Sequence, residues 1–220
     1  MGEILYKILI KGGSYLTIWR GVQATVYITL MSLIFGTLLG ICVCALRMSR
    51  VKILSVFANV YITLLRGSPV LMLLMLMYYG VFAGTDFEAD SIAIVTFALN
   101  VAAHVAEILR AAISATDHGQ VEAARTLGFS KFQAFYLVTF PQALRIAKPV
   151  YQSAIVNLLQ WTSVVGYVSI TDLTRVINNI ASRTMQPMIT IVIGMLIYLV
   201  LAYVIHGIFA ITDYFGVRKS

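Results

Sequence analysis

The sequence predicts an all-α membrane protein with five transmembrane helices and one short cytoplasmic helix in a polar loop. Of the 220 residues, 60% are hydrophobic and only 11% are charged, which is more apolar surface than a water-soluble domain of this size can bury. Lipid offers the backbone no hydrogen-bond partners, so helices are the economical way to cross it. One polar segment, residues 119–128, interrupts the apolar pattern between two long runs.

Five apolar runs have the length of a membrane span, about 20 residues of helix. The predicted spans are residues 22–46, 53–82, 91–114, 140–168 and 188–211. The second run contains the polar sequence Arg66-Gly67-Ser68-Pro69. We expect the fourth to begin earlier, as a cytoplasmic helix.

The parts outside the spans are assigned separately. Residues 1–20 are predicted to be an external segment, with an interfacial helix over residues 1–15. Residues 21–212 form the predicted transmembrane domain, which includes the polar loop at residues 117–131. Residues 213–220 form the predicted cytoplasmic tail.

Loop charges predict the orientation of the chain. Ten cations follow the first span, surround the polar loop or end the chain: Arg47, Arg50, Lys52, Arg110, Arg125, Lys131, Arg145, Lys148, Arg218 and Lys219. An excess of Lys and Arg marks the cytoplasmic side, so the N-terminus is expected outside and the C-terminus inside. The net charge of +7 does not indicate nucleic-acid binding, because no basic face with stacking aromatics remains outside the spans.

Small residues follow one face of the first span. Ser32, Gly36, Gly40 and Cys44 lie four residues apart, so another helix can approach this face closely. We interpret the stripe as a packing surface. Cys42 and Cys44 point in different directions on the helix and cannot form a disulfide with each other.

A polar stripe follows the third span. Asn100, His104 and Glu107 lie at i, i+4 and i+7 and therefore share a face. Ionisable residues inside a bilayer normally face a bundle interior or an aqueous cavity, so the stripe is a candidate lining of a transport path. The alternative is a structural cluster in which Glu107 pairs with Arg110.

The fourth span repeats the pattern. Ser153, Asn157 and Gln160 again lie at i, i+4 and i+7, and Trp161, Thr162 and Ser163 follow them. Two helices with polar stripes can enclose a hydrated path, whereas the alternative is hydrogen bonding between helices. Pro149 is expected to bend the helix before the stripe. His206, alone near the end of the fifth span, is interpreted as structural.

No catalytic or metal-binding set is recognisable in the sequence. The two cysteines lack metal-ligand spacing with the three histidines, and no glycine-rich phosphate loop ends in Lys-Ser or Lys-Thr. If transport uses ATP, another chain must bind it.

The polar loop has the features of a short docking helix. Residues 121–127 are predicted to be helical, and Gly128 can adopt the left-handed conformation that ends a helix. Ala123 and Ala124 leave the backbone close to the helix surface, so the helix can enter a groove on a partner. Glu122 is placed in the first turn, where the helix dipole favours an acid.

At this loop the chain resembles the permeases of type I ABC importers. Glu122-Ala123-Ala124, Gly128 and Pro141 have the spacing of their coupling motif, with Val138-Thr139-Phe140-Pro141 where the consensus is Ile-x-Leu-Pro. Other stretches resemble the polar amino-acid uptake branch: Leu65-Arg66-Gly67-Ser68-Pro69, Ala106-Glu107-Ile108-Leu109-Arg110-Ala111, Gly119-Gln120, Pro141-Gln142-Ala143-Leu144-Arg145 and Thr162-Ser163. The similarity extends from about residue 20 to residue 212.

The resemblance implies a transporter of several chains in a bacterial plasma membrane. Two permease subunits, identical or related, form the path, and two cytoplasmic ATPases carry ATP-Mg, so this chain is expected to bind no cofactor and to hydrolyse nothing. An external solute-binding protein delivers a polar or basic amino acid. The implied coupling residues are Gly119, Gln120, Glu122, Ala123, Ala124, Arg125 and Gly128.

The implied substrate site lies near mid-membrane, between the third and fourth spans. Its candidate residues are those of the two polar stripes: Asn100, His104, Glu107, Ser153, Asn157, Gln160, Trp161, Thr162 and Ser163. Many relatives have Lys-Asp-Thr-Ser where this chain has Gln160-Trp161-Thr162-Ser163. Trp161 can contact a cationic side chain, and Glu107 can supply a countercharge. Two alternatives stay open: this chain has a different substrate specificity from those relatives, or it supports a partner subunit that binds the substrate in a heterodimer.

Three other functions compete with this interpretation. A proton- or ion-coupled secondary transporter would use His104 and Glu107 as a relay, although such carriers usually contain paired repeats. An ABC importer subunit for a different small solute is the second alternative. A membrane scaffold or sensor that transports nothing is the third.

Overall fold

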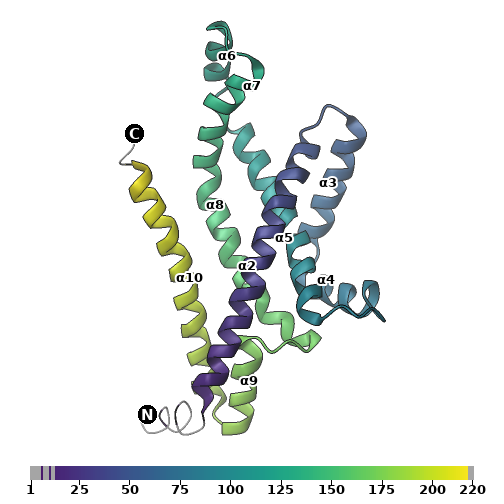
Figure 1. Cartoon of the computed structure of the whole chain (residues 1–220), viewed down its shortest axis with the longest axis vertical. Helices are drawn as coiled ribbons and strands as arrows, with labels where there is room; N and C mark the ends of the chain where they lie inside the picture. Colours follow the sequence, from purple (N-terminus) through teal and green to yellow (C-terminus); the bar gives the residue numbers. More distant parts are fainter. Residues whose placement is uncertain (1–5, 7–9, 11–12, 218–220) are drawn as a thin grey trace. The chain divides into compact units, whose positions relative to one another are not determined.

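The computed structural model of the chain describes residue 6, residue 10 and residues 13–217. Within this described part the chain forms helices joined by short loops, and no strand occurs (Figure 1). The chain divides into two compact units: Met1–Leu33, Pro69–Phe97 and Ile155–Ser220 belong to unit 1, and Ile34–Ser68 and Ala98–Ala154 belong to unit 2.

The helices follow the predicted order with additional breaks. They are α2 (Ser14–Arg47), α3 (Lys52–Gly67), α4 (Val70–Leu76), η2 (Met77–Val81), α5 (Ala89–Ser114), α6 (His118–Thr126), α7 (Lys131–Ala134), η3 (Phe135–Thr139), α8 (Phe140–Trp161), η4 (Thr162–Val168), α9 (Leu173–Thr184) and α10 (Pro187–Val217). Of the short elements, η2 and η3 are π-helical and η4 is a 3-10 helix.

Three of these helices are long and apolar enough to cross a membrane: Ser14–Arg47, Ala89–Ser114 and Pro187–Thr212. Two bent pairs raise the possible number to five spans. Lys52–Gly67 and Val70–Val81 meet at 107°, and Lys131–Val168 and Leu173–Thr184 meet at 58°. Each region where the sequence predicts a span thus contains a helix, or a bent pair of helices, that is long and apolar enough to cross a membrane. The number of spans depends on whether each bent pair crosses as one span.

The second predicted span, residues 53–82, is not one straight helix. It breaks at Ser68, whose backbone is extended (φ −93°, ψ 137°), directly before Pro69. A proline disfavours the helical conformation of the residue before it and lacks the N–H that would continue the ladder. The sequence showed this polar turn, but the interpretation as one span underestimated its effect. The fourth span does begin early, as expected, because its helical region starts at Lys131.

Both ends of the chain extend the predicted helices. Helix α2 begins at Ser14 rather than at residue 22, and α10 continues to Val217, so the first residues of the predicted tail are helical. The interfacial helix predicted over residues 1–15 falls largely outside the described residues.

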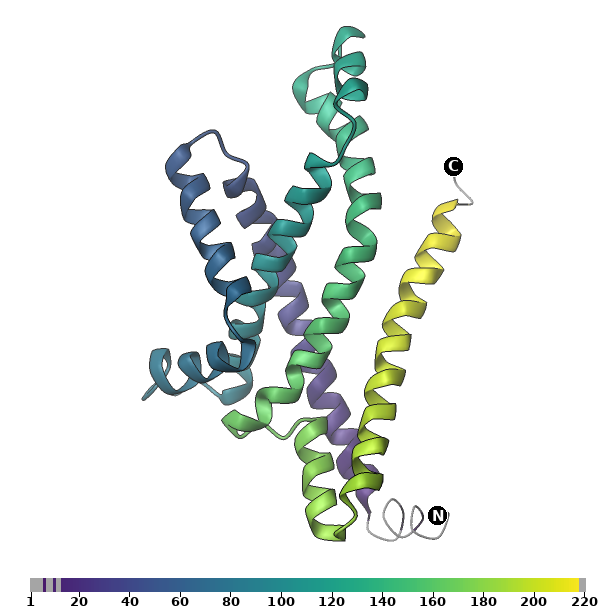
Figure 2. The ribbon, with the colours of Figure 1, turned by 180° about the vertical axis from the view of Figure 1, so that it is seen from behind.

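Unit 1 is built on a helical hairpin. Helices α9 and α10 lie side by side in Figure 1 and in the reverse view of Figure 2, and the start of α2 packs on α9. The shared core contains Ile18, Leu173, Val176, Ile177 and Ile180. The helices α2 and α9 approach so closely that a Cβ on Gly21 would lie 3.0 Å from the Leu173 Cα.

Unit 2 confirms the predicted packing role of the small-residue stripe. A Cβ on Gly36 would lie 2.7 Å from the Val101 side chain, and a Cβ on Gly40 would lie 2.7 Å from that of Val105. Cys44 is buried with Ala58 and Ala103 in one core cluster. The stripe therefore lets α2 contact α5 backbone to backbone.

Gly40→Ala is expected to destabilise the folded chain by about 1–3 kcal/mol, because overpacking forces the close-packed helices apart. The added carbon would also lie 2.9 Å from the Ala102 carbonyl oxygen, which cannot rotate away. Thermal unfolding in detergent measures the effect. Gly207→Ala is the matched control, because nothing lies within 4 Å of its Cβ position in α10. Equal melting temperatures for the two variants would contradict the close approach.

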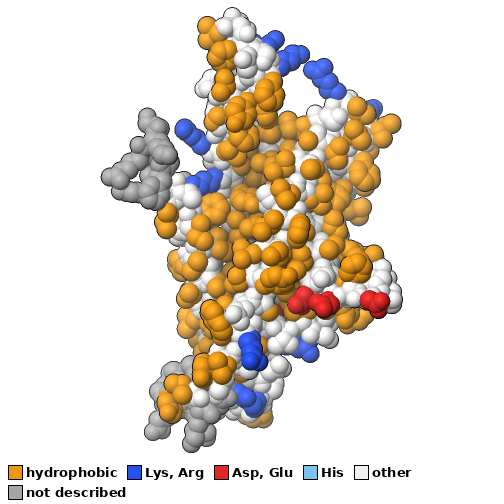
Figure 3. All heavy atoms as spheres, viewed as in Figure 1, with side chains coloured by type: hydrophobic (Ala, Val, Ile, Leu, Met, Phe, Trp, Pro, Cys, Tyr) orange, Lys and Arg blue, Asp and Glu red, His pale blue; other side chains and the backbone are white. Residues whose placement is uncertain are grey.

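The outer surface of the helices is strongly apolar. In the most apolar 18-residue stretch of α10, only 11% of the residues are buried within the chain. In the corresponding stretch of α5, 61% are buried. Hydrophobic side chains cover most of the face in Figure 3. An apolar surface of this extent requires lipid or another subunit as its neighbour.

Candidate functional site

The polar loop folds into the short helix that the sequence predicted. Helix α6 spans His118–Thr126, and the Asp117 side chain caps it by accepting a hydrogen bond from the Gly119 N–H at 2.8 Å. Because the helix begins three residues earlier than the predicted start at residue 121, Glu122 is its fifth residue. The prediction that Glu122 lies in the first turn, where the dipole would stabilise it, is therefore wrong.

A Schellman motif ends α6 at the predicted glycine. Gly128 has φ +91°, in the left-handed region, which confirms the prediction that it ends the helix. The Phe129 N–H donates to the Ala124 carbonyl and the Gly128 N–H to the Arg125 carbonyl, both at 3.1 Å. The Arg125 guanidinium donates to the Phe129 carbonyl at 2.5 Å, so this side chain stabilises the turn in the isolated chain.

Helix α6 is tied to α8 on one side and exposed on the other. The Gln142 side-chain amide donates to the Gln120 side-chain carbonyl at 2.8 Å, and Ala124 is buried. Glu122 and Ala123 are exposed. Sequence reasoning missed Leu127, which is 79% exposed; its signal was a leucine directly before the stop glycine. The exposed face combines an acid, a small residue and a large apolar residue, and an exposed apolar side chain on a helix can enter a hydrophobic groove of a partner.

The third-span stripe is engaged within unit 2. Asn100 is buried and its amide donates to the Leu65 carbonyl at 2.8 Å, which satisfies a carbonyl in the last turn of the broken helix α3. The Arg110 guanidinium donates to both carboxylate oxygens of Glu107, with 2.6 Å between Nη2 and Oε1. The structural alternative for Glu107 is thus the arrangement observed. His104 is half-buried on the same face.

The fourth-span stripe is exposed along α8. Ser153, Asn157 and Gln160 all lie on the exposed side of the helix. Pro149 lies inside α8, which continues to Trp161. Thr162 is fully buried and donates to the Leu159 carbonyl at 2.7 Å, where the α-helix tightens into η4.

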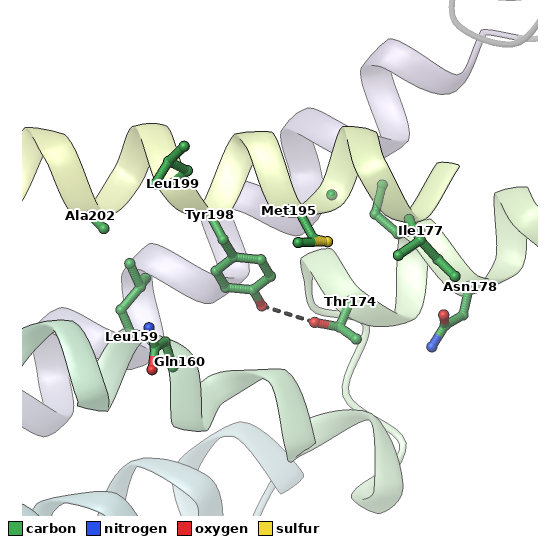
Figure 4. Close-up of a pocket in the computed structure, with 11 residues that line it drawn as sticks. Leu159, Gln160, Thr174, Ile177, Asn178, Met195, Tyr198, Leu199 and Ala202 are labelled. Atoms are coloured by element: carbon green, nitrogen blue, oxygen red, sulfur yellow. Dashed lines mark hydrogen bonds between the residues drawn. The ribbon is translucent and has the colours of Figure 1, made fainter. Parts of the chain in front are cut away.

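Unit 1 contains a half-open cavity of about 400 Å³ between the end of α8, α9 and α10. Figure 4 shows four polar side chains on its wall: Gln160, Thr174, Asn178 and Tyr198. Leu159, Met195 and Leu199 contribute to its apolar wall. A mostly apolar cavity with a few convergent polar groups is the usual form of a small-molecule site, and its size suits an amino acid.

Comparison with known proteins assigns the chain to a family. Residues 18–213 match the family described as binding-protein-dependent transport system inner membrane component. The chain belongs to this family. The predicted resemblance is thereby confirmed, and the helices described above are those of an ABC importer permease.

Individual relatives align with the permease over nearly its whole length. The probable amino-acid ABC transporter permease YckA of Bacillus subtilis is 32% identical over 197 residues, with 89% of this chain and 87% of the relative covered. The nopaline transport system permease NocM of Agrobacterium fabrum is 30% identical over 212 residues, with 91% and 88% covered. The histidine/lysine/arginine/ornithine permease HisM of Salmonella typhimurium is 30% identical over 202 residues, with 87% and 86% covered.

Solved structures give the same fold. A chain from a crystal structure of an amino acid ABC transporter with histidines has a TM-score of 0.86 at 30% identity, covering 94% of this permease and 97% of that chain. An inward-facing form of the methionine transporter MetNI has a TM-score of 0.71 at 21% identity, covering 89% and 94%. The permease therefore has the type I ABC importer fold.

The cavity of the permease only partly overlaps the predicted path residues. Gln160 lines it, whereas Asn157, Trp161 and Ser163 do not contribute to its wall. Sequence reasoning missed Thr174, Asn178 and Tyr198. The first two are four residues apart, a spacing that could have marked one polar helix face, but Tyr198 joins them only through the packing of α10 on α9.

Proposed function

We propose that this chain is a permease subunit of an ATP-driven importer of polar or basic amino acids in a bacterial plasma membrane. The observation that carries the proposal is helix α6, an exposed helix capped at both ends that carries the Glu-Ala-Ala and glycine spacing of a coupling element. Amino-acid transport is supported by the names of the relatives, among them YckA and HisM.

In this proposal the permease crosses the membrane five times. The two bent helix pairs each count as one span, the N-terminus is outside and the C-terminus is cytoplasmic. Residues 1–20, 21–212 and 213–220 keep the roles predicted for them. Two permease subunits, equal or related, assemble with two ATPases that bind ATP-Mg, and an external binding protein delivers the solute. The permease itself holds no nucleotide.

Coupling runs through α6 in this proposal. Each ATPase holds one α6 by its exposed face, which includes Glu122, Ala123 and Leu127. ATP binding closes the ATPase pair and moves α6, and the Gln120–Gln142 hydrogen bond transmits the movement to α8. Helix α8 is helical from Phe140 to Trp161, and its residues Leu159 and Gln160 line the cavity. The other proposed coupling residues, Gly119, Ala124, Arg125 and Gly128, shape the helix and its ends.

The solute binds in the cavity of unit 1, where Gln160 offers an amide. For the other residues of the two polar stripes, contact with the solute stays a prediction. Glu107 is the least favoured as a direct contact, because its carboxylate is occupied by Arg110. The secondary-transporter alternative depends on the same residue, so the observed pair weakens that alternative as well.

Gln160→Ala is expected to reduce solute-stimulated ATP hydrolysis about ten- to hundredfold, because the loss of one hydrogen bond to a charged group costs about 1.5–3 kcal/mol. The measurement uses the permease reconstituted with its ATPase and binding protein, tested across an amino-acid panel. Gln186→Ala, at an exposed glutamine before α10 and outside the cavity, is the matched control. Glu107→Gln and Trp161→Ala test the other predicted contacts.

Two outcomes would contradict the proposal. Uptake by the purified chain alone, driven by a proton gradient without an ATPase, would establish a secondary transporter. Unchanged hydrolysis in all three variants would place the solute site elsewhere or in a partner subunit.

A further inference from the structure

The turn that joins α2 to α3 in unit 2 carries three cations and no acid. Arg47 is the last residue of α2, and Arg50 and Lys52 follow it as exposed residues. The sequence contains no aspartate or glutamate from residue 4 to residue 85. Arg47 does interact electrostatically with Glu107 on α5, but that carboxylate already forms a salt bridge with Arg110. The positive charge of the turn is therefore not neutralised by the described part of the chain.

Hydrogen-bond donors at the turn also lack acceptors. The Arg47 Nε is buried and has no hydrogen-bond partner among the described residues, although buried donors are normally bonded. Helix α3 begins after Val51, which has no side-chain acceptor to cap it, and the first turn of α3 contains no acid. The first N–H groups of α3 thus add positive potential to the same turn.

The turn itself is well defined. The Ser55 hydroxyl, in the first turns of α3, donates to the Arg47 carbonyl at 2.9 Å. The Val51 N–H donates to the Ser49 hydroxyl oxygen at 3.1 Å. These bonds join the end of α2 to the start of α3, so the cations are held on a short, ordered turn.

One face of α3 continues from the turn as an exposed apolar stripe. Its residues lie at i, i+4, i+7 and i+11 and are Ile53, Phe57, Val60 and Leu64. Each is more than half exposed, whereas Ala58 and Ile62 on the opposite face are buried in the core of unit 2. At 1.5 Å per residue the stripe is about 16 Å long, roughly half of a hydrocarbon core of about 30 Å. The stripe therefore has the length of one leaflet.

This arrangement matches the two parts of an anionic phospholipid. Arginine forms charge-assisted, often bidentate hydrogen bonds with phosphate oxygens. An acyl chain needs an apolar surface that begins at the headgroup and extends across one leaflet. The cations lie at one end of such a surface, so a single lipid can contact both.

We propose that the α2–α3 turn binds the phosphate headgroup of an anionic phospholipid, whose acyl chain lies along the stripe from Ile53 to Leu64. In the orientation proposed above, the lipid belongs to the cytoplasmic leaflet. The inference goes beyond transport and is independent of the solute carried. A bound lipid offsets the charge of the turn and stabilises the folded hairpin.

The test measures thermal unfolding and retained lipid, by native mass spectrometry, for the purified permease in a neutral detergent. Phosphatidylglycerol, phosphatidylcholine and inorganic phosphate are added separately. We expect phosphatidylglycerol alone to raise the melting temperature and to stay bound. Replacing two cations, in Arg50→Gln/Lys52→Gln, should weaken phosphatidylglycerol binding about thirtyfold, because each cation near an anionic surface contributes about a factor of five.

Two further variants separate the turn from general charge and the headgroup from the chain. Lys131→Gln/Arg145→Gln removes two exposed cations elsewhere in unit 2 and should bind phosphatidylglycerol like the unchanged protein. Ile53→Ser/Phe57→Ser keeps every cation and should weaken binding through the loss of the apolar stripe.

Four results would overturn the proposal. Equal stabilisation by phosphatidylglycerol and phosphatidylcholine would show that the headgroup charge is not recognised. Equal losses in the two charge variants would show that only the net charge matters. Stabilisation by inorganic phosphate to the same extent would make the turn a small-anion site, and unchanged binding in Ile53→Ser/Phe57→Ser would remove the stripe. These readouts require no transport, so they stand or fall separately from the proposed function.

Discussion

Replacing Gly128 with proline is expected to abolish ATP-driven uptake while the transporter remains assembled. Gly128 adopts φ +91°, whereas proline is fixed near −65°. Proline also removes the N–H that donates to the Arg125 carbonyl. The Schellman motif therefore cannot form, and the last turn of α6 unwinds together with the exposed Leu127.

The size of the effect follows from the backbone. A proline that conflicts with the local conformation costs about 3 kcal/mol or more, which corresponds to about two orders of magnitude in the population of the competent loop. Assembly should survive, because nothing lies within 4 Å of the Cβ position of Gly128, so the strain is confined to the turn that ends α6. Uptake in proteoliposomes and co-purification of the subunits give the two readouts.

Gly128→Asn is the matched control, because asparagine tolerates the left-handed region. It should retain most of the uptake. If the proline variant transports normally, α6 does not couple the ATPases to the permease. If it fails to assemble while the asparagine variant assembles, Gly128 has a structural role and the coupling assignment loses its support.

Features that depend on neighbouring residues in the sequence were predictable. The stop at Gly128 follows from the conformational freedom of glycine after a helical pattern. The close contacts at Gly36 and Gly40 follow from four-residue spacing alone. Each of these predictions depends on the sequence of a single helix. Neither requires knowledge of which helix packs against it.

Features that depend on competing local choices were harder to predict. The break at Ser68 was visible in the sequence, yet the apolar residues on both sides favoured one continuous span. Glu107 had two possible partners, a transported solute or Arg110 three residues later. Nothing in the sequence shows which of the two it binds. The early start of α6 depended on whether Asp117 acts as its cap, which in turn moved Glu122 out of the first turn.

The cavity could not be predicted from the sequence, for a different reason. Its polar wall joins α8, α9 and α10, and only Gln160 belongs to a stripe on a long apolar helix. Asp172 lies between the fourth and fifth predicted spans, and nothing in the sequence distinguishes it from an exposed loop acid. Its burial, and its link to Tyr198 across 26 residues of sequence, exist only because α9 and α10 fold back on each other.

Ala202→Trp is expected to reduce transport by about two orders of magnitude, or ~2.8 kcal/mol. Ala202 lies on α10 at the cavity wall. An indole at this position would fill space that the solute needs and would compete with it for the apolar wall formed by Leu159 and Leu199. The chain should still fold, because the cavity of about 400 Å³ accepts the ring without overpacking the core.

Ala210→Trp is the matched control for this variant, because Ala210 is exposed on the same helix and does not line the cavity. Solute binding and ATP-driven uptake should be lost in Ala202→Trp and kept in Ala210→Trp, with similar melting temperatures for both. Loss of uptake with binding intact would mean that α10 has to move during transport rather than that the cavity holds the solute. Normal binding and uptake in Ala202→Trp would remove the cavity from the path, because a ring that fills the cavity cannot leave solute binding in it unchanged.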